Sequence, residues 1–117
     1  MDEEQFLEAT VIDEDILAIV IRGNLDATTT DEFNSEVQKH LDQGANKIIL
    51  DCRNLGMLSS IGIGALITLQ TRLRKRGGVV KLCSLQGMAS EVIKLVRLGK
   101  LLGIYGDLEF ARKSFYE

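Results

Sequence analysis

Short apolar runs alternate with longer segments of helical periodicity along this chain. Runs of four to eight apolar residues are typical of buried strands. Four such runs predict strands at 16–21, 47–52, 79–83 and 101–105, and a mixed alternation of apolar and polar residues predicts another at 6–12. The turn Asp13-Glu14-Asp15 joins 6–12 to 16–21, which predicts an antiparallel hairpin at the start of the fold. We expect 47–52 at the centre of the sheet and 101–105 at an edge.

Apolar residues three or four positions apart predict helices between the strands. The first helix is expected to begin near Thr29, because Thr29 and Glu32 have capping-box spacing, and to end at Gly44. The second runs from Ser60 to about Arg76, the third over about 88–98, and the last follows a cap at Asp107. The residues expected to face the core are Phe33, Val37 and Leu41; Ala65, Leu66, Leu69 and Leu73; Met88, Val92, Leu95 and Val96; and Phe110, Ala111 and Phe115.

The order of these elements predicts an α/β fold. Two strands come first and helices then alternate with strands, which favours a mixed, mostly parallel sheet of four or five strands with about four helices. The pattern leaves open whether the helices lie mainly on one face. A chain of 117 residues suits one compact domain and is too short for two, and we expect the core to span about 6–115.

Composition and charge narrow the class of protein. With 45% hydrophobic and 26% charged residues, the chain can bury a core. The net charge of −3 argues against a nucleic-acid-binding protein, which would be basic. No apolar run is long enough to span a bilayer. The acidic start Met1–Gln5 is unlike a signal peptide. We therefore expect a cytoplasmic protein that binds neither nucleic acid nor membrane; the oligomeric state stays open.

The common catalytic and cofactor motifs are missing. The glycines Gly62 and Gly64 are followed by apolar residues and not by the lysine of a phosphate-binding loop, and the third glycine of a dinucleotide fingerprint is absent. No glycine precedes Ser60 at the spacing of a nucleophile elbow. Cys52 and Cys83 are expected to be buried thiols, and with His40 alone they cannot supply four zinc ligands. We expect no enzyme, cofactor or metal.

The pair Ser59-Ser60 marks the one candidate site. These hydroxyls lie at the start of the second helix, where unpaired N–H groups and the helix dipole favour a phosphate, bound or covalent. A purely structural interpretation is also open. Serine is a preferred helix N-cap, and Gly62 and Gly64 could serve only close helix packing.

Two motifs resemble those of STAS domains, the family of bacterial anti-sigma factor antagonists. The family pattern is an aspartate that ends a strand, a short loop, and then Asp/Ser-Ser-Ser/Thr/Ala-Gly-Leu-Gly. This chain has Asp51 and then the segment 59–64, Ser-Ser-Ile-Gly-Ile-Gly. A Gly-x-Leu-Asp turn after the second strand is matched by Gly23-Asn24-Leu25-Asp26, and the element order agrees over nearly the whole chain.

The resemblance implies a function. Ser60 matches the serine that is phosphorylated by an anti-sigma factor that doubles as a serine kinase, with Ser59 as the back-up acceptor. Asp26 matches an acid close to that serine. The unphosphorylated antagonist would bind the anti-sigma factor, phosphorylation would release it, and a phosphatase would restore binding. The expected partner-binding residues are Asn24, Asp26, Met57, Leu58, Ser59, Ser60, Ile61 and Gly62.

Alternatives remain within this interpretation. Met57 and Leu58 either contact the partner or cover the sheet edge. Ser59 stands where many antagonists have aspartate, and Ile61 is bulkier than the usual Ser, Thr or Ala. Ile61 favours a second hypothesis, a STAS-like scaffold or accessory subunit of a signalling or lipid-transport assembly that is never phosphorylated. A third is weak nucleotide binding or hydrolysis.

Overall fold

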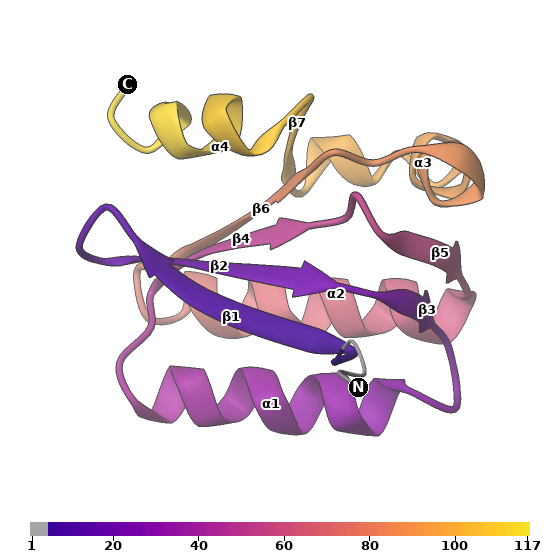
Figure 1. The fold of residues 1–117 in the computed structure, drawn as a ribbon, viewed down its shortest axis with the longest axis horizontal. Coiled ribbons are helices and arrows are strands. Elements are labelled where there is room, and N and C mark those ends of the chain that lie inside the picture. Colours follow the sequence, from indigo (N-terminus) through magenta and orange to yellow (C-terminus); the bar gives the residue numbers. More distant parts are fainter. Residues whose placement is uncertain (1–4) are drawn as a thin grey trace, which may run out of the picture.

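Five strands form the main sheet, in the order β1-β2-β4-β6-β7. The computed structural model describes residues 5–117. The strands are β1 (Leu7–Ile12), β2 (Ile16–Ile21), β4 (Lys47–Asp51), β6 (Val79–Cys83) and β7 (Gly103–Tyr105). β1 pairs antiparallel with β2, and every other neighbouring pair in this sheet is parallel. The opening hairpin, the mixed sheet and the central position of 47–51 are therefore confirmed (Figure 1).

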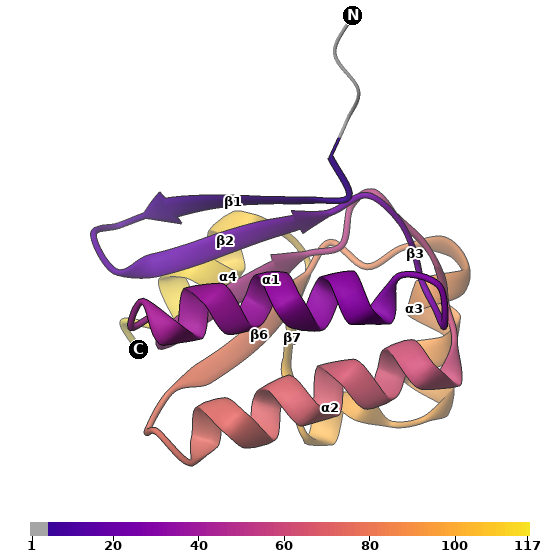
Figure 2. The ribbon, with the colours of Figure 1, turned by 90° about the horizontal axis from the view of Figure 1, so that it is seen from below.

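Helices cover both faces of this sheet. α1 (Thr30–Asp42) and α2 (Ser60–Arg74) lie side by side on one face, and Figure 2 shows both in front of the strands. α4 (Leu108–Ser114) covers the other face, and α3 (Gly87–Leu95) lies against the short strand β5 (Leu55–Leu58). A single turn of 3₁₀ helix, η1 (Leu98–Lys100), follows α3. This distribution of helices answers the question that the sequence pattern leaves open.

The core has two unequal parts. The larger lies between the sheet and α1 and α2, where Phe33, Ile48 and Leu66 are almost fully buried. The smaller lies under α4 and contains Ile49 and Ala111. Since β4 is covered on both faces, its side chains form a continuous apolar run rather than an alternating one.

The start of α1 differs from the predicted capping box. Thr29 does occupy the N-cap position, but its side chain makes no capping hydrogen bond. Its hydroxyl instead donates to the carbonyl of Asn24 at 2.8 Å and accepts from the N–H of Asp26 at 3.1 Å. The Thr29 hydroxyl therefore stabilises the loop before α1 and does not cap the helix as the sequence predicts. At α4 the prediction is confirmed, since Asp107 accepts from the N–H of Phe110 at 2.8 Å.

The predicted inward face of α3 is largely wrong. Met88, Leu95 and Val96 are 65%, 81% and 48% exposed, and the buried residues are Ala89 and Ile93. α3 ends at Leu95 and lies against β5 and not flat on the main sheet, so a different stripe of the helix meets the core. Val92 is half-buried, as predicted.

The last helix shows a smaller error of the same kind. Phe110, which was predicted to face the core, is 62% exposed, whereas Ala111 is buried as predicted. Phe115 is half-buried and packs against the smaller core cluster.

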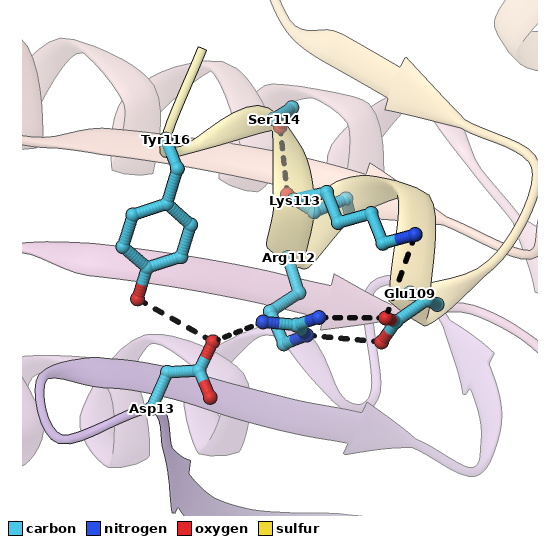
Figure 3. Close-up of polar contacts among 7 residues, drawn as sticks. Asp13, Glu109, Arg112, Lys113, Ser114 and Tyr116 are labelled. Carbon is cyan, nitrogen blue, oxygen red and sulfur yellow. Dashed lines mark hydrogen bonds and ion pairs between the residues drawn. The ribbon is translucent and has the colours of Figure 1, made fainter.

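Charged side chains fasten α4 to the turn of the hairpin (Figure 3). The guanidinium of Arg112 donates to Asp13 at 2.6 Å and to both carboxylate oxygens of Glu109, at 2.9 and 2.6 Å. The hydroxyl of Tyr116 donates to Asp13 at 3.4 Å. The hydrogen bond from Arg112 lowers the pKa of Glu109. This cluster joins the opening hairpin to the last helix, although Asp13 and Arg112 are 99 residues apart in the sequence.

The sequence predicts neither a membrane-spanning helix nor a signal peptide. Within residues 5–117, no helix combines the length and apolar character needed to cross a bilayer. Residues 1–4, which carry most of the acidic start unlike a signal peptide, lie outside the described residues.

Candidate functional site

A second, two-stranded sheet builds the candidate site. β3 (Gly23–Leu25) pairs in parallel with β5, with Gly23 opposite Leu55 and Leu25 opposite Leu58. The N–H of Gly23 donates to the carbonyl of Asn54 at 3.1 Å. The sequence predicts neither strand, because segments of three and four residues are too short to show a period. The pairing places them together at the end of the sheet where α2 begins (Figure 1).

Hydrogen bonds tie the Asn24–Asp26 segment to the start of α2. The side-chain carbonyl of Asn24 accepts from the N–H of Met57 at 2.8 Å, and the N–H of Ser59 donates to the carbonyl of Leu25 at 3.1 Å. Two segments more than 30 residues apart are thereby held at fixed positions. The structure therefore brings the Gly-x-Leu-Asp turn and the serine pair into one patch.

The two serines have different surroundings. Ser59 is the N-cap of α2 and half-buried, and its hydroxyl accepts from the N–H of Gly62 at 3.3 Å. Ser60 is the first residue of the helix and is exposed. Its hydroxyl makes no hydrogen bond to any of the described residues. Capping therefore explains Ser59, whereas the fold makes no use of the Ser60 hydroxyl.

Gly62 allows α2 to approach β3 closely. A Cβ atom there would lie 2.3 Å from the carbonyl oxygen of Leu25 and 3.0 Å from the side chain of Leu58. The contact with the Leu25 carbonyl is impossible unless the backbone moves, and the contact with Leu58 would require its side chain to shift. At Gly64 a Cβ would meet nothing within 4 Å. The packing interpretation holds for the first glycine, and no contact of the fold requires the second.

The apolar part of the patch differs from the predicted one. Met57 and Ile61 are 49% and 52% exposed, so both side chains are available to a partner. Leu58 is 3% exposed and belongs to the core, which is the sheet-covering alternative. Met57 and Leu58 can differ in this way because neighbouring side chains of a strand point to opposite faces.

Asp26 contributes a negative charge to the patch. Its carboxylate accepts from the N–H and the hydroxyl of Thr28 at 2.9 and 2.7 Å. These hydrogen bonds lower the pKa of Asp26, and the bond from the Thr28 hydroxyl has the largest effect. The side chain is therefore ionised at neutral pH, and it comes directly after Leu25, whose carbonyl is bonded to Ser59.

Asp51, the aspartate of the signature, has a structural role. It is 2% exposed and ends β4 at the centre of the sheet. One carboxylate oxygen accepts from the N–H of Arg53 and the other from its guanidinium, both at 3.1 Å. These bonds hold the turn that leads into β5, and so they help to position the patch.

The cysteines are free and buried, as predicted. Burial raises the pKa of Cys83 to about 11 and raises that of Cys52 further. Neither thiol is a reactive nucleophile at neutral pH. Within residues 5–117, no group of three His, Cys, Asp or Glu side chains is placed to hold a metal ion.

Comparisons with known proteins define the family. The sequence pattern of the STAS domain matches residues 8–111. The chain belongs to the STAS domain family, as the two motifs indicated. Solved structures of anti-sigma factor antagonists share its fold.

Individual relatives agree with this class. A putative anti-sigma factor antagonist of Bordetella bronchiseptica, BtrV, is 22% identical over 100 residues, covering 86% of each chain. The crystal structure of a putative anti-sigma factor antagonist from Thermotoga maritima superposes with a TM-score of 0.89, at 20% identity and 95% coverage of both chains. The antagonist SpoIIAA in its unphosphorylated form gives a TM-score of 0.79 at 19% identity, covering 94% of this chain and 96% of that one. The phosphorylated form of Bacillus SpoIIAA gives 0.72 at 19% identity, covering 93% and 98%.

Proposed function

We propose that this protein is a cytoplasmic anti-sigma factor antagonist, controlled by phosphorylation of Ser60. It acts as a binding module and not as a catalyst. The unmodified protein binds an anti-sigma factor that is also a serine kinase, phosphorylation releases it, and a phosphatase resets it. The observation that carries the proposal is the exposed Ser60 hydroxyl, which has no role in the fold and stands at the first position of α2 in the family's signature loop.

The position of Ser60 lets a phosphate act on binding more than on folding. A phosphoserine carries about −1.5 to −2 charges at pH 7. At the first turn of its own helix this charge faces the positive end of the dipole, which contributes about 0.3–1 kcal/mol. In a closed interface the same dianion must be desolvated, at a cost of several kcal/mol if no cation pairs with it. A loss of only about 3 kcal/mol weakens binding roughly a hundredfold.

The surroundings of Ser60 suit a docking surface. The exposed side chains of Met57 and Ile61 provide apolar contact area, and Asn24 and Asp26 add polar groups on a fixed backbone. Leu58, Ser59 and Gly62 support this surface from within: Leu58 fills the core, Ser59 caps the helix, and Gly62 permits its close approach.

Mass spectrometry after incubation with kinases of the anti-sigma class and MgATP tests the modification. We expect one phosphate on the wild type, none on Ser60→Ala, and one on Ser59→Ala. Loss of the Ser59 cap costs about 1 kcal/mol of stability but leaves the acceptor in place. Modification of Ser60→Ala would assign the acceptor to Ser59 and contradict the proposal.

Binding measurements test the consequence. Ser60→Ala should bind the anti-sigma factor as the wild type does, and Ser60→Asp should bind at least tenfold more weakly, while both variants melt within about 2 °C of the wild type. A Ser60→Asp variant that binds normally would contradict the electrostatic mechanism. If phosphorylated protein melted far below unmodified protein, the effect would be on the fold and not on docking.

One observation favours a second candidate, a STAS scaffold or accessory subunit that is never phosphorylated. Ile61 directly follows Ser60 and is 52% exposed, so a β-branched side chain stands on the surface where the family pattern has Ser, Thr or Ala. Under this alternative no kinase modifies the wild type, whereas Ile61→Ala is modified. Modification of the wild type excludes it.

A further inference from the structure

A cavity lies between the end of α3, η1 and β7, and its lining residues fall within 85–106, well after the Ser60 patch in the sequence. It is open to solvent and has a volume of about 470 Å³, within the range of small-ligand sites. Its apolar wall includes Leu85, Ile93 and Ile104, of which Ile93 is 3% exposed. None of its lining residues belongs to the patch around Ser60.

Three cations surround this apolar wall. Lys94, Arg97 and Lys100 all line the cavity, and its lining contains no acidic residue. Among residues 5–117, no hydrogen bond or ion pair engages any of their side chains. In a chain of net charge −3, three unpaired cations at one apolar cavity are a local reversal of charge. Such a rim complements an anionic group attached to an apolar body.

Arg97 has a backbone conformation that glycine would adopt more easily. It follows the last turn of α3 in the left-handed region, with φ at +55°. This position after a helix is most often glycine, because a Cβ is disfavoured there. The helix end does not need an arginine, and the side chain lines the cavity.

We propose that this cavity binds a small organic anion with an apolar tail, whose carboxylate or phosphate group meets Lys94, Arg97 and Lys100. The tail lies against Ile93 and Ile104. The site is independent of the proposed antagonist function, because it shares no residue with the Ser60 patch.

Titration of the full-length, ¹⁵N-labelled protein tests the site. The probes are octanoate and octyl phosphate below their micelle-forming concentrations, with 1-octanol and inorganic phosphate as matched controls for tail and head. We expect both anionic amphiphiles to shift the amide signals of residues 93–106, and each control to bind at least tenfold more weakly. No shifts with either amphiphile, or equal binding of 1-octanol or of phosphate alone, would overturn the proposal.

Two variants separate binding from folding. Arg97→Gly removes a cation and also relieves the left-handed backbone, so it should weaken octyl phosphate about tenfold without lowering the melting temperature. Glu14→Gly, at another left-handed position (φ +69°) in the hairpin turn, is the matched control and should bind normally. Gly99→Leu should abolish binding, since Gly99 lines the cavity and a Cβ there meets only Ile104 at 3.5 Å. Unchanged affinity in Arg97→Gly and Gly99→Leu would contradict the assignment.

Discussion

At the level of single residues, the serine pair shows how neighbours in sequence acquire different roles. The hydroxyl of Ser59 caps the helix, and Ser60, one position later, presents its hydroxyl to solvent. The sequence placed both at a helix start, and the family resemblance favoured Ser60 as the acceptor over Ser59, but neither established which hydroxyl caps the helix. The choice follows from helix geometry, because only the N-cap side chain can reach back to the free N–H groups of the first turn.

The two glycines of the signature make a matched pair for testing close packing. Gly62→Ala should lower the free energy of unfolding by about 1–3 kcal/mol, because the new methyl group would overlap the backbone of Leu25. Gly64→Ala should raise it by up to about 1 kcal/mol, since the site is open and alanine favours the helix. Urea unfolding at neutral pH measures both. Equal effects of the two substitutions would contradict the close approach of α2 to β3.

At the level of helices and strands, periodicity found every long element and misjudged the faces of the short ones. α1 and α2 bury the residues that were predicted, because a helix of 13 or 15 residues lying along a sheet must turn its apolar stripe inward. α3 has nine residues and lies against β5, so its orientation depends on a neighbour that the sequence did not reveal.

Alanine substitutions in α3 test this orientation. Ile93→Ala should cost about 2–5 kcal/mol of stability, because the side chain is buried and its loss leaves a cavity. Leu95→Ala, two positions further along, should stay within about 0.5 kcal/mol, because Leu95 is 81% exposed. Chemical denaturation of the two variants in parallel measures the difference. A larger loss of stability in Leu95→Ala than in Ile93→Ala would support the buried face predicted from the sequence.

For the molecule as a whole, the two thiols report on global unfolding. Cys83 ends β6, and Cys52 directly follows the neighbouring strand β4. They are 0% and 1% exposed, so a reagent reaches them only when the sheet opens. At pH 8 the native protein should therefore react with a thiol reagent far more slowly than the urea-unfolded chain. Rapid reaction of the native protein would mean that this edge of the core opens locally.

The same thiols make stability fall in alkali. A thiol in the unfolded chain ionises near its ordinary pKa of 9.0, whereas burial holds the pKa of Cys83 at about 11 in the folded protein. Unfolding between these values releases a proton, so the free energy of unfolding is unaffected by this group below pH 9 and falls as the pH rises toward 11. Denaturation at pH 7, 9 and 10.5 measures the fall. In Cys83→Ala the free energy of unfolding should fall less steeply with pH. If the slope were unchanged, other groups would be responsible for the fall.

Local periodicity and short motifs were enough to establish the order of elements, the hairpin, the buried face of the long helices and the family. They also located the serine pair at a helix start. Only packing in three dimensions established that 23–25 and 55–58 pair, that helices cover both faces, and that Leu58 is buried while Met57 is exposed. The difference comes from separation along the chain. A contact between segments 30 residues apart leaves no period in either one, because it forms only when both are packed on the same core.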